Sequence, residues 1–167
     1  MMKADRPRLD LPITKAEWAL LMMTLVVVGG TVAVVYYYWA NLPEQITIHF
    51  DIFGTPDRKG PKGTLIFLCA VSILNCLLML ILARFPHTFN YLKPITEKNA
   101  ARQYSLARKF IVVMNLEVTG IMFFAIWSCI QVSVGAAQSI DLSSLVSLLV
   151  ALIVSVAIYM FRANRNV

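Results

Sequence analysis

Charged residues are scarce in this chain of 167 residues. Asp, Glu, Lys and Arg together make up 14% of the sequence, whereas hydrophobic residues make up 59%, and the mean hydropathy is +0.70. Soluble globular domains carry about 25% charged residues. The low charge therefore excludes a soluble domain of this size and predicts a protein embedded in a lipid bilayer.

Histidine and cysteine are scarce as well, with two His and three Cys in the chain. Cys69, Cys76 and Cys129 all lie in apolar stretches, where thiols behave as small hydrophobic groups. We therefore expect neither a disulfide framework nor a metal site. The sequence also lacks an HExxH motif, paired aspartates within an apolar stretch, and a Ser and His at one depth there. These absences argue against an intramembrane enzyme, and no cofactor is expected.

Four apolar runs are long enough to cross about 30 Å of hydrocarbon at about 1.5 Å per residue. They cover residues 17–39, 64–83, 110–132 and 142–161. The pattern predicts an all-α membrane protein, with residues 1–167 forming a single integral membrane domain. Its expected architecture is a four-transmembrane-helix bundle with an ordered extracytoplasmic loop over 40–63 and a cytoplasmic loop over 84–109. The first run is too long and too aromatic at its end for a signal peptide, so we expect a retained anchor.

Basic residues are distributed unevenly over the segments between these runs. Twelve of the fifteen Lys and Arg lie in the N-terminal tail, which includes Lys3, in the loop 84–109, or at the C-terminal end. The positive-inside rule then places both termini in the cytoplasm and the loop 40–63 outside. Orientation and attraction to anionic lipid account for the net charge of +6, so no nucleic acid partner is expected.

The loop 40–63 carries an alternation typical of a β-strand. Ile46, Ile48 and Phe50 would point to one side, and Thr47, His49 and Asp51 to a wet side. Gly54 and the pair Pro56-Asp57 predict a turn after the strand. We expect the apolar side, together with Ile52 and Phe53, to lie over the aromatic end of the first helix, residues 36–39.

Residues of this loop also carry a family resemblance: Leu42-Pro43, Ile46, Ile48-His49-Phe50-Asp51, Gly54, Pro56-Asp57 and Lys62. The stretch resembles the N-terminal domain of the SdpI-type bacterial membrane proteins, a family named for an immunity protein against a secreted killing peptide. Thr47 stands where that family usually has proline, and Lys59 where it often has an aromatic residue. A second block, Phe85 to Arg108, is similar to stand-alone members of the same grouping. The resemblance implies a protein of the bacterial cytoplasmic membrane.

Three groups of polar residues are candidates for function. The first, in the outer loop, comprises His49, Asp51, Asp57 and Lys62, for which we consider ligand binding. Since one His and two carboxylates from a single loop make a poor metal ligand set, the competing interpretation is that the imidazole hydrogen-bonds a carboxylate and holds the turn.

The second group consists of the strongly polar residues inside the spans, Asn75, Asn115 and Glu117. Asn75 and Glu117 lie at matching depth, about 12 to 14 Å from the inner surface. A carboxylate facing lipid costs at least about 2.5 kcal/mol, so we expect Glu117 to face inward with Asn75 as its partner. It is either a proton-relay or ion-coupling group, or a structural hydrogen-bonding group.

The third group is basic. Thr96 is the expected N-cap of a membrane-surface helix that continues into the third span. Its cations would contact lipid or a cytoplasmic regulator: Lys98, Arg102, Arg108 and Lys109. A stripe of small residues on the fourth span, Ser143, Ser147, Ala151 and Ser155, indicates a helix interface, either within the bundle or between copies in a homo-oligomer.

These features allow three functions. The preferred one is a membrane sensor or immunity protein that binds an extracellular peptide or other ligand through the outer loop. The alternatives are a small transporter or transporter subunit that uses Glu117, and a structural subunit of a membrane complex.

Overall fold

Four long helices and one β-hairpin make up the fold, in a computed structural model that describes residues 6–165. The basic tail residue Lys3 lies outside this range. The elements, in chain order, are α1 (Lys15–Tyr38), β1 (Gln45–Phe50), β2 (Pro56–Pro61), α2 (Gly63–Leu82), the single-turn 3-10 helix η2 (Pro86–Thr88), α3 (Ala100–Ser133) and α4 (Leu142–Arg165). The fold is mostly helical, as expected, and all four long helices are long and apolar enough to cross a membrane, which fits a multi-pass membrane protein.

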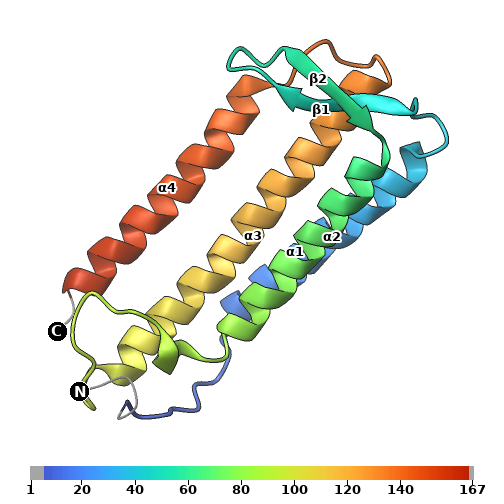
Figure 1. Cartoon of the computed structure of the whole chain (residues 1–167). Helices are drawn as coiled ribbons and strands as arrows, with labels where there is room; N and C mark the ends of the chain where they lie inside the picture. The colour runs from blue at the N-terminus through green and yellow to red at the C-terminus, as the bar shows by residue number, and fades with distance from the viewer. Residues whose placement is uncertain (1–5, 166–167) are drawn as a thin grey trace.

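Helix α3 is the centre of the arrangement. It lies between α4 on one side and the pair α1 and α2 on the other, and it contacts all three (Figure 1). The two termini lie at one end of the molecule, and the hairpin lies across the helix ends at the other (Figure 1). The apolar stretch of α4 has no buried residue, because this helix packs on α3 with one side only. Most of its apolar surface is therefore free of contact with the other described helices.

One of the two expectations was that the small-residue stripe on α4 packs against another helix of the bundle. Most of the stripe does not. Ser143, Ser147 and Ala151 are exposed. Only Ser155 is partly buried, against α3. Elsewhere α4 meets α3 through larger side chains, such as Tyr159, whose ring stacks on Phe110 at 4.3 Å between centroids.

Helix α3 is longer than the expected span over 110–132, because it begins at Ala100. Its first turns are covered by other parts of the chain. Ala100 and Tyr104 are fully buried and pack with Ile95, Tyr91 and the tail residue Leu11. This small core stabilises the helix beyond the apolar stretch that would cross the membrane.

The expected N-cap Thr96 lies one turn before the helix. Its backbone N–H donates to the Asn99 side chain at 2.8 Å, and Asn99 N–H donates to the Thr96 hydroxyl at 3.3 Å. These reciprocal bonds close a turn. The helix consequently begins after Asn99, which is its N-cap residue.

The hairpin packs on the helix ends through one face of β1. Ile46 is completely buried, and Ile48 and Phe50 pack against the same core of α1, α2 and α3 residues. Strands β1 and β2 pair antiparallel, with Ile46 opposite Gly60. A Cβ at Gly60 would lie 2.6 Å from Cδ1 of Ile48, so a larger residue there would force the end of the Ile48 side chain to move.

Three expectations about the loop were wrong in detail. Pro56 and Asp57 begin β2 instead of forming the turn; the tip is residues 51–55, where Gly54 adopts φ 82°. Thr47 is buried, because its side of β1 meets the end of α3, where its N–H donates to the Ser133 hydroxyl at 2.9 Å. Ile52 and Phe53 are 85% and 75% exposed at the tip, since the tip extends beyond the aromatic end of α1 toward the start of α4 (Figure 1).

The contrast between Ile46 and Ile52 predicts how the hairpin is held. Ile46→Ala removes a fully buried side chain and should cost about 2 to 5 kcal/mol, whereas Ile52→Ala at the exposed tip should be nearly neutral. Trypsin digestion of the detergent-solubilised protein measures the difference, because Arg58 and Lys59 lie in β2. We expect Ile46→Ala to be cut in the hairpin at least about tenfold faster than the parent. Equal cutting of the two variants would contradict the packing described for β1.

Candidate functional site

The hairpin holds two of the four predicted ligand residues next to each other. His49 Nδ1 lies 2.6 Å from Asp57 Oδ1, and the two side chains are about half exposed, at 54% and 44%. His49 is at the end of β1 and Asp57 at the start of β2, so the contact joins the two strands. The structure thus contains the hydrogen bond between the imidazole and a carboxylate that was one of the two interpretations.

The other two predicted ligand residues lie elsewhere. The Asp51 carboxylate accepts hydrogen bonds from the backbone N–H groups of Phe53 and Thr55 and so shapes the tip. Lys62 forms an ion pair with Glu44 at 2.9 Å and lies over the Trp39 ring. Within residues 6–165, no three His, Cys, Asp or Glu side chains are grouped so that they could hold a metal ion.

A hollow of about 450 Å³ lies beside the hairpin. Its walls come from β1, β2, the end of α3 and the connection from α3 to α4. Asp57, Arg58 and Lys59 line it from β2, and all three are exposed. Among residues 6–165 the sheet has two strands, so the far edge of β2 has no strand partner there. Strand β2 thus gives the hollow a charged wall and also has one open edge.

The tip of the hairpin is hydrogen-bonded to the connection between α3 and α4. Ile140 N–H donates to the carbonyl of Gly54 at 2.9 Å, and a Cβ at Gly54 would lie about 3.0 Å from the Ile140 side chain. Next to this contact, Asp141 caps the start of α4, and hydrogen bonds from Ser143 and Ser144 lower the pKa of its carboxyl to about 2. Two walls of the hollow, the hairpin and the connection from α3 to α4, are therefore bonded to each other through their backbones.

The polar residues within the spans do not form one layer. The predicted bond between Glu117 and Asn75 is not formed: Glu117 Oε1 accepts from the Ser155 hydroxyl of α4 at 2.6 Å. Asn115 instead donates to the carbonyl of Cys76 on α2 at 3.3 Å. Asn75 Nδ2 is buried without a partner among the described residues.

Helix geometry explains this division. Residues two positions apart are separated by about 200° around an α-helix, so Asn115 and Glu117 point to nearly opposite sides of α3. Asn115 consequently faces α2, and Glu117 faces α4. The second carboxylate oxygen of Glu117 is buried and has no partner among the described residues.

The end of the molecule near the termini holds a buried ion pair that joins α1 and α3. Arg108 Nε donates to Glu17 Oε1 at 2.9 Å, and the side chains are only 11% and 2% exposed. The same guanidinium donates to the carbonyls of Leu11 and Pro12, each at 2.7 Å. Glu17 also accepts from the backbone and hydroxyl of Thr14, completing a capping box at the start of α1. All the charges are therefore satisfied within the chain.

The tail before α1 is fastened to the loop after α2. Arg6 donates to the carbonyls of His87 and Phe89 and lies over the Tyr91 ring. The Tyr91 hydroxyl donates to the carbonyl of Pro86 at 2.7 Å, and burial raises the pKa of that hydroxyl. The tail and loop thus form one ordered layer across this end of the bundle.

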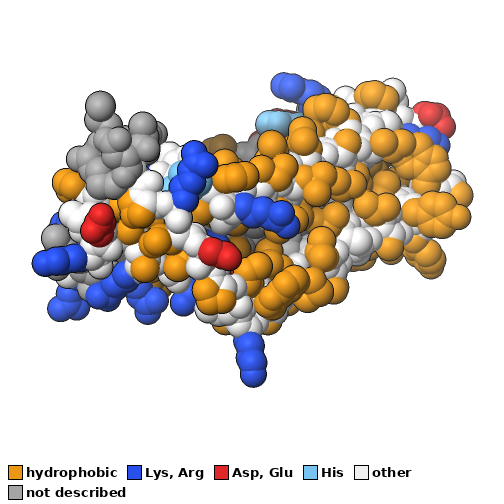
Figure 2. Space-filling view, turned by 90° about the horizontal axis from the view of Figure 1, so that it is seen from below, with side chains coloured by type: hydrophobic (Ala, Val, Ile, Leu, Met, Phe, Trp, Pro, Cys, Tyr) orange, Lys and Arg blue, Asp and Glu red, His pale blue; other side chains and the backbone are white. Residues whose placement is uncertain are grey.

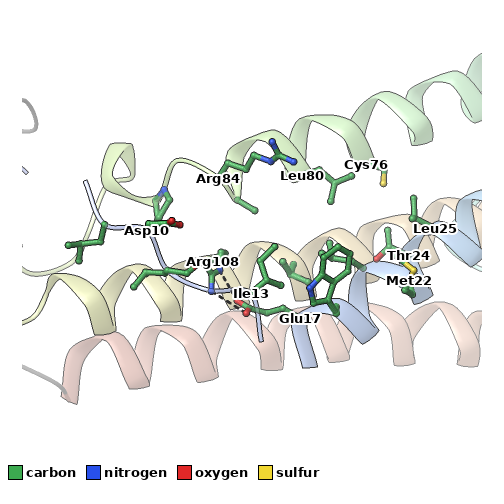
Figure 3. Close-up of a pocket in the computed structure, with 17 residues that line it drawn as sticks. Asp10, Ile13, Glu17, Met22, Thr24, Leu25, Cys76, Leu80, Arg84 and Arg108 are labelled. Carbon is green, nitrogen blue, oxygen red and sulfur yellow. Dashed lines mark hydrogen bonds and ion pairs between the residues drawn. The ribbon is translucent and has the colours of Figure 1, made fainter. Parts of the chain in front are cut away.

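Beneath this layer lies a cavity of about 520 Å³ between α1, α2 and α3. Figure 3 shows Arg84 and Leu80 on the α2 wall, opposite the Glu17 and Arg108 pair. Its inner part is lined mostly by apolar side chains, including Leu21, Leu25, Leu80 and Val112. Asp10 and Arg84 at its polar end are exposed, and their side chains have no hydrogen bond or ion pair with any described residue.

Most of the basic residues predicted to contact lipid or a regulator are exposed: Lys98, Arg102 and Lys109. Arg108 is the exception, because it is buried in the ion pair with Glu17. Figure 2 shows Lys and Arg side chains gathered at the end where both termini lie, with hydrophobic side chains over much of the flank toward the other end.

Sequence reasoning missed the ion pair and the cavity. The pattern Thr14-Lys15-Ala16-Glu17 is a capping-box signature and could have drawn attention to Glu17. Nothing local pairs Glu17 with a residue 91 positions further along the chain. Asp10 and Arg84 carry no motif either, and they share a site only because the tail crosses the end of α2.

Comparison with known proteins yields one match. Residues 26–74 match the family model described as "Domain of unknown function (DUF1648)". The matched segment runs from within α1 through β1 and β2 into α2, so it contains the whole hairpin and leaves out α3 and α4. No curated protein and no solved structure matches the chain.

The buried ion pair should dominate the stability of the end near the termini. Arg108→Gln leaves the Glu17 carboxylate uncompensated, and removing one partner of a buried pair costs about 3 to 5 kcal/mol. Thermal unfolding in detergent micelles measures the loss. Lys109→Gln, an exposed change of the same charge on the same helix, should stay within about 0.5 kcal/mol of the parent.

The double variant tests whether the two side chains act as a pair. Glu17→Gln with Arg108→Gln should cost less than the sum of the two single changes. If Arg108→Gln unfolds at the same temperature as Lys109→Gln, the ion pair does not hold this end.

Proposed function

We propose that this chain is a sensor or immunity protein of a bacterial cytoplasmic membrane, which binds an extracellular peptide through its hairpin. The observation that carries the proposal is the exposed strand β2, which gives the hollow its charged wall of Asp57, Arg58 and Lys59 and has one edge without a strand partner among residues 6–165. An extended peptide can add to such an edge through backbone hydrogen bonds. Proline has no backbone N–H to donate, so the prolines at both ends of β2 restrict this pairing to the residues between them. The peptide would therefore form its backbone hydrogen bonds mainly with residues 57–60.

The distribution of basic residues supports the orientation that this function needs. The exposed Lys98, Arg102 and Lys109 lie at the end with both termini, and the positive-inside rule assigns such an end to the cytoplasm. The hairpin then faces outward. Its resemblance to the SdpI-type N-terminal domain, carried by residues between Leu42 and Lys62, supports a peptide as the ligand.

The exposed tip fits the same role. Ile52 and Phe53 are mostly exposed at the tip of the hairpin that also carries Asp57, Arg58 and Lys59, and an apolar pair on the same hairpin as charged groups suits an amphipathic peptide. Because Gly54 is bonded to Ile140, the tip is held in place before any ligand arrives, which lowers the entropic cost of binding.

Survival of a sensitive bacterium tests the proposal. Cells expressing the parent should withstand secreted killing peptides of the kind that the family resists. Arg58→Ala with Lys59→Ala removes both cations from the wall, and we expect the protective effect to fall at least about tenfold in peptide concentration. Lys98→Ala with Arg102→Ala, at equal membrane levels, is the matched control for lost charge and should protect like the parent.

The outcomes separate the parts of the proposal. Protection by every variant would move the binding site away from the hairpin. Absence of protection by the parent would remove immunity as the function.

A small transporter is the alternative, favoured by the position of Glu117. An acidic side chain inside a span is a functional candidate, and one of its oxygens is buried without a described partner. Ser155 on α4 donates to the other oxygen, so a proton or cation bound there would sit between α3 and α4.

Proton flux into proteoliposomes, reported by an internal pH dye, tests this alternative. Glu117→Gln should reduce flux to that of protein-free vesicles, while Glu97→Gln in the exposed loop should leave it unchanged. Equal flux through both variants would remove Glu117 from any transport mechanism.

A further inference from the structure

The cavity between α1, α2 and α3 has the composition of an amphiphile site. It measures about 520 Å³, within the range of about 300 to 1,000 Å³ of ligand pockets. Side chains such as Leu21, Leu25, Leu80 and Val112 make its inner part apolar, and its charged residues lie together at the end nearest the tail. An apolar body with one polar end matches a lipid better than a sugar, a nucleotide or a free ion.

The depth of the cavity points to a membrane lipid. It lies at the ends of the membrane-spanning helices, where Arg84 follows the last turn of α2 and Trp18 lies in the first turn of α1. Trp and Arg side chains at such positions lie at the level of the lipid head groups. Trp18 is 51% exposed and also lines the cavity, so the cavity wall is continuous with the surface that lipid covers.

The charges at the polar end define the head group. Arg108 and Glu17 neutralise each other and are satisfied within the chain. Arg84 and Asp10 are the charged lining residues without a partner among the residues described, and they carry opposite signs. A purely anionic head group would meet an unpaired carboxylate there, whereas a zwitterionic one has a group for each.

We infer that this cavity binds an acyl chain of a phospholipid whose head group carries a phosphate and a primary amine. The chain enters between α1 and α2, the phosphate pairs with Arg84, and the ammonium pairs with Asp10. This assignment is independent of the peptide-binding proposal, because it uses the opposite end of the molecule.

Tryptophan fluorescence tests the assignment directly. The chain has three Trp, so Trp39→Phe with Trp127→Phe leaves Trp18 as the reporter in the cavity wall. The protein is placed in phosphatidylglycerol vesicles containing a small fraction of brominated phosphatidylethanolamine or, in a parallel sample, brominated phosphatidylglycerol. Bromine quenches on contact, and we expect the ethanolamine lipid to quench Trp18 more strongly at equal mole fraction.

Control variants separate a built site from bulk lipid. Arg84→Gln and Asp10→Asn should each reduce the preference for the ethanolamine lipid by about fivefold, the effect of one exposed charge pair. Lys109→Gln and Glu97→Gln change the same charges at the same end without lining the cavity, and they should keep the preference. A protein that retains only Trp127, which contacts Tyr38 toward the hairpin end, should show no preference.

Two other quenching results would contradict the assignment of this cavity to an ethanolamine phospholipid. Equal quenching by the two brominated lipids would mean that Trp18 samples bulk lipid only. Stronger quenching by phosphatidylglycerol would identify an anionic ligand. Native mass spectrometry gives a second measurement, in which the parent should retain one phosphatidylethanolamine and Arg84→Gln should retain it about fivefold less; equal retention by the two proteins would exclude Arg84 as the phosphate partner.

Discussion

Backbone polar groups within a bilayer have to be satisfied inside the chain, and this constraint organises the whole protein. It restricts membrane-spanning segments to helices, and residues 6–165 contain four helices long and apolar enough to span. The non-helical backbone is consequently confined to the two ends, as the hairpin at one end and the tail with its loop at the other. The chemistry of the protein is concentrated in the same two places.

Helix α3 connects these two ends through side chains that bond to backbone. Ser133 near its C-terminus accepts the N–H of Thr47 in the hairpin. Arg108 near its N-terminus donates to the carbonyls of Leu11 and Pro12 in the tail. Because both irregular segments are bonded to the same helix, their positions relative to each other are set by its length.

The two ends offer different surfaces. The hairpin presents a charged wall, an open strand edge and two exposed apolar side chains, which suits a ligand arriving from water. The opposite end has a mostly apolar cavity with a polar mouth, which suits a ligand arriving from the membrane. Between them, Asn115 of α3 donates to Cys76 on α2, and Glu117 accepts from Ser155 on α4, the helix whose apolar stretch has no buried residue.

Local sequence patterns determined the number and approximate limits of the spans, the strand over 46–50 and the concentration of basic residues at one end. These properties depend on hydropathy and spacing over short distances. The tertiary structure alone decided that Glu17 pairs with Arg108, that Glu117 meets Ser155 and not Asn75, and that Asp10 and Arg84 line one cavity. Such contacts depend on how each helix is rotated about its axis and on which neighbour it packs against. Because the surfaces of the apolar helices are almost uniformly hydrophobic, their sequences indicate neither the rotation nor the neighbour.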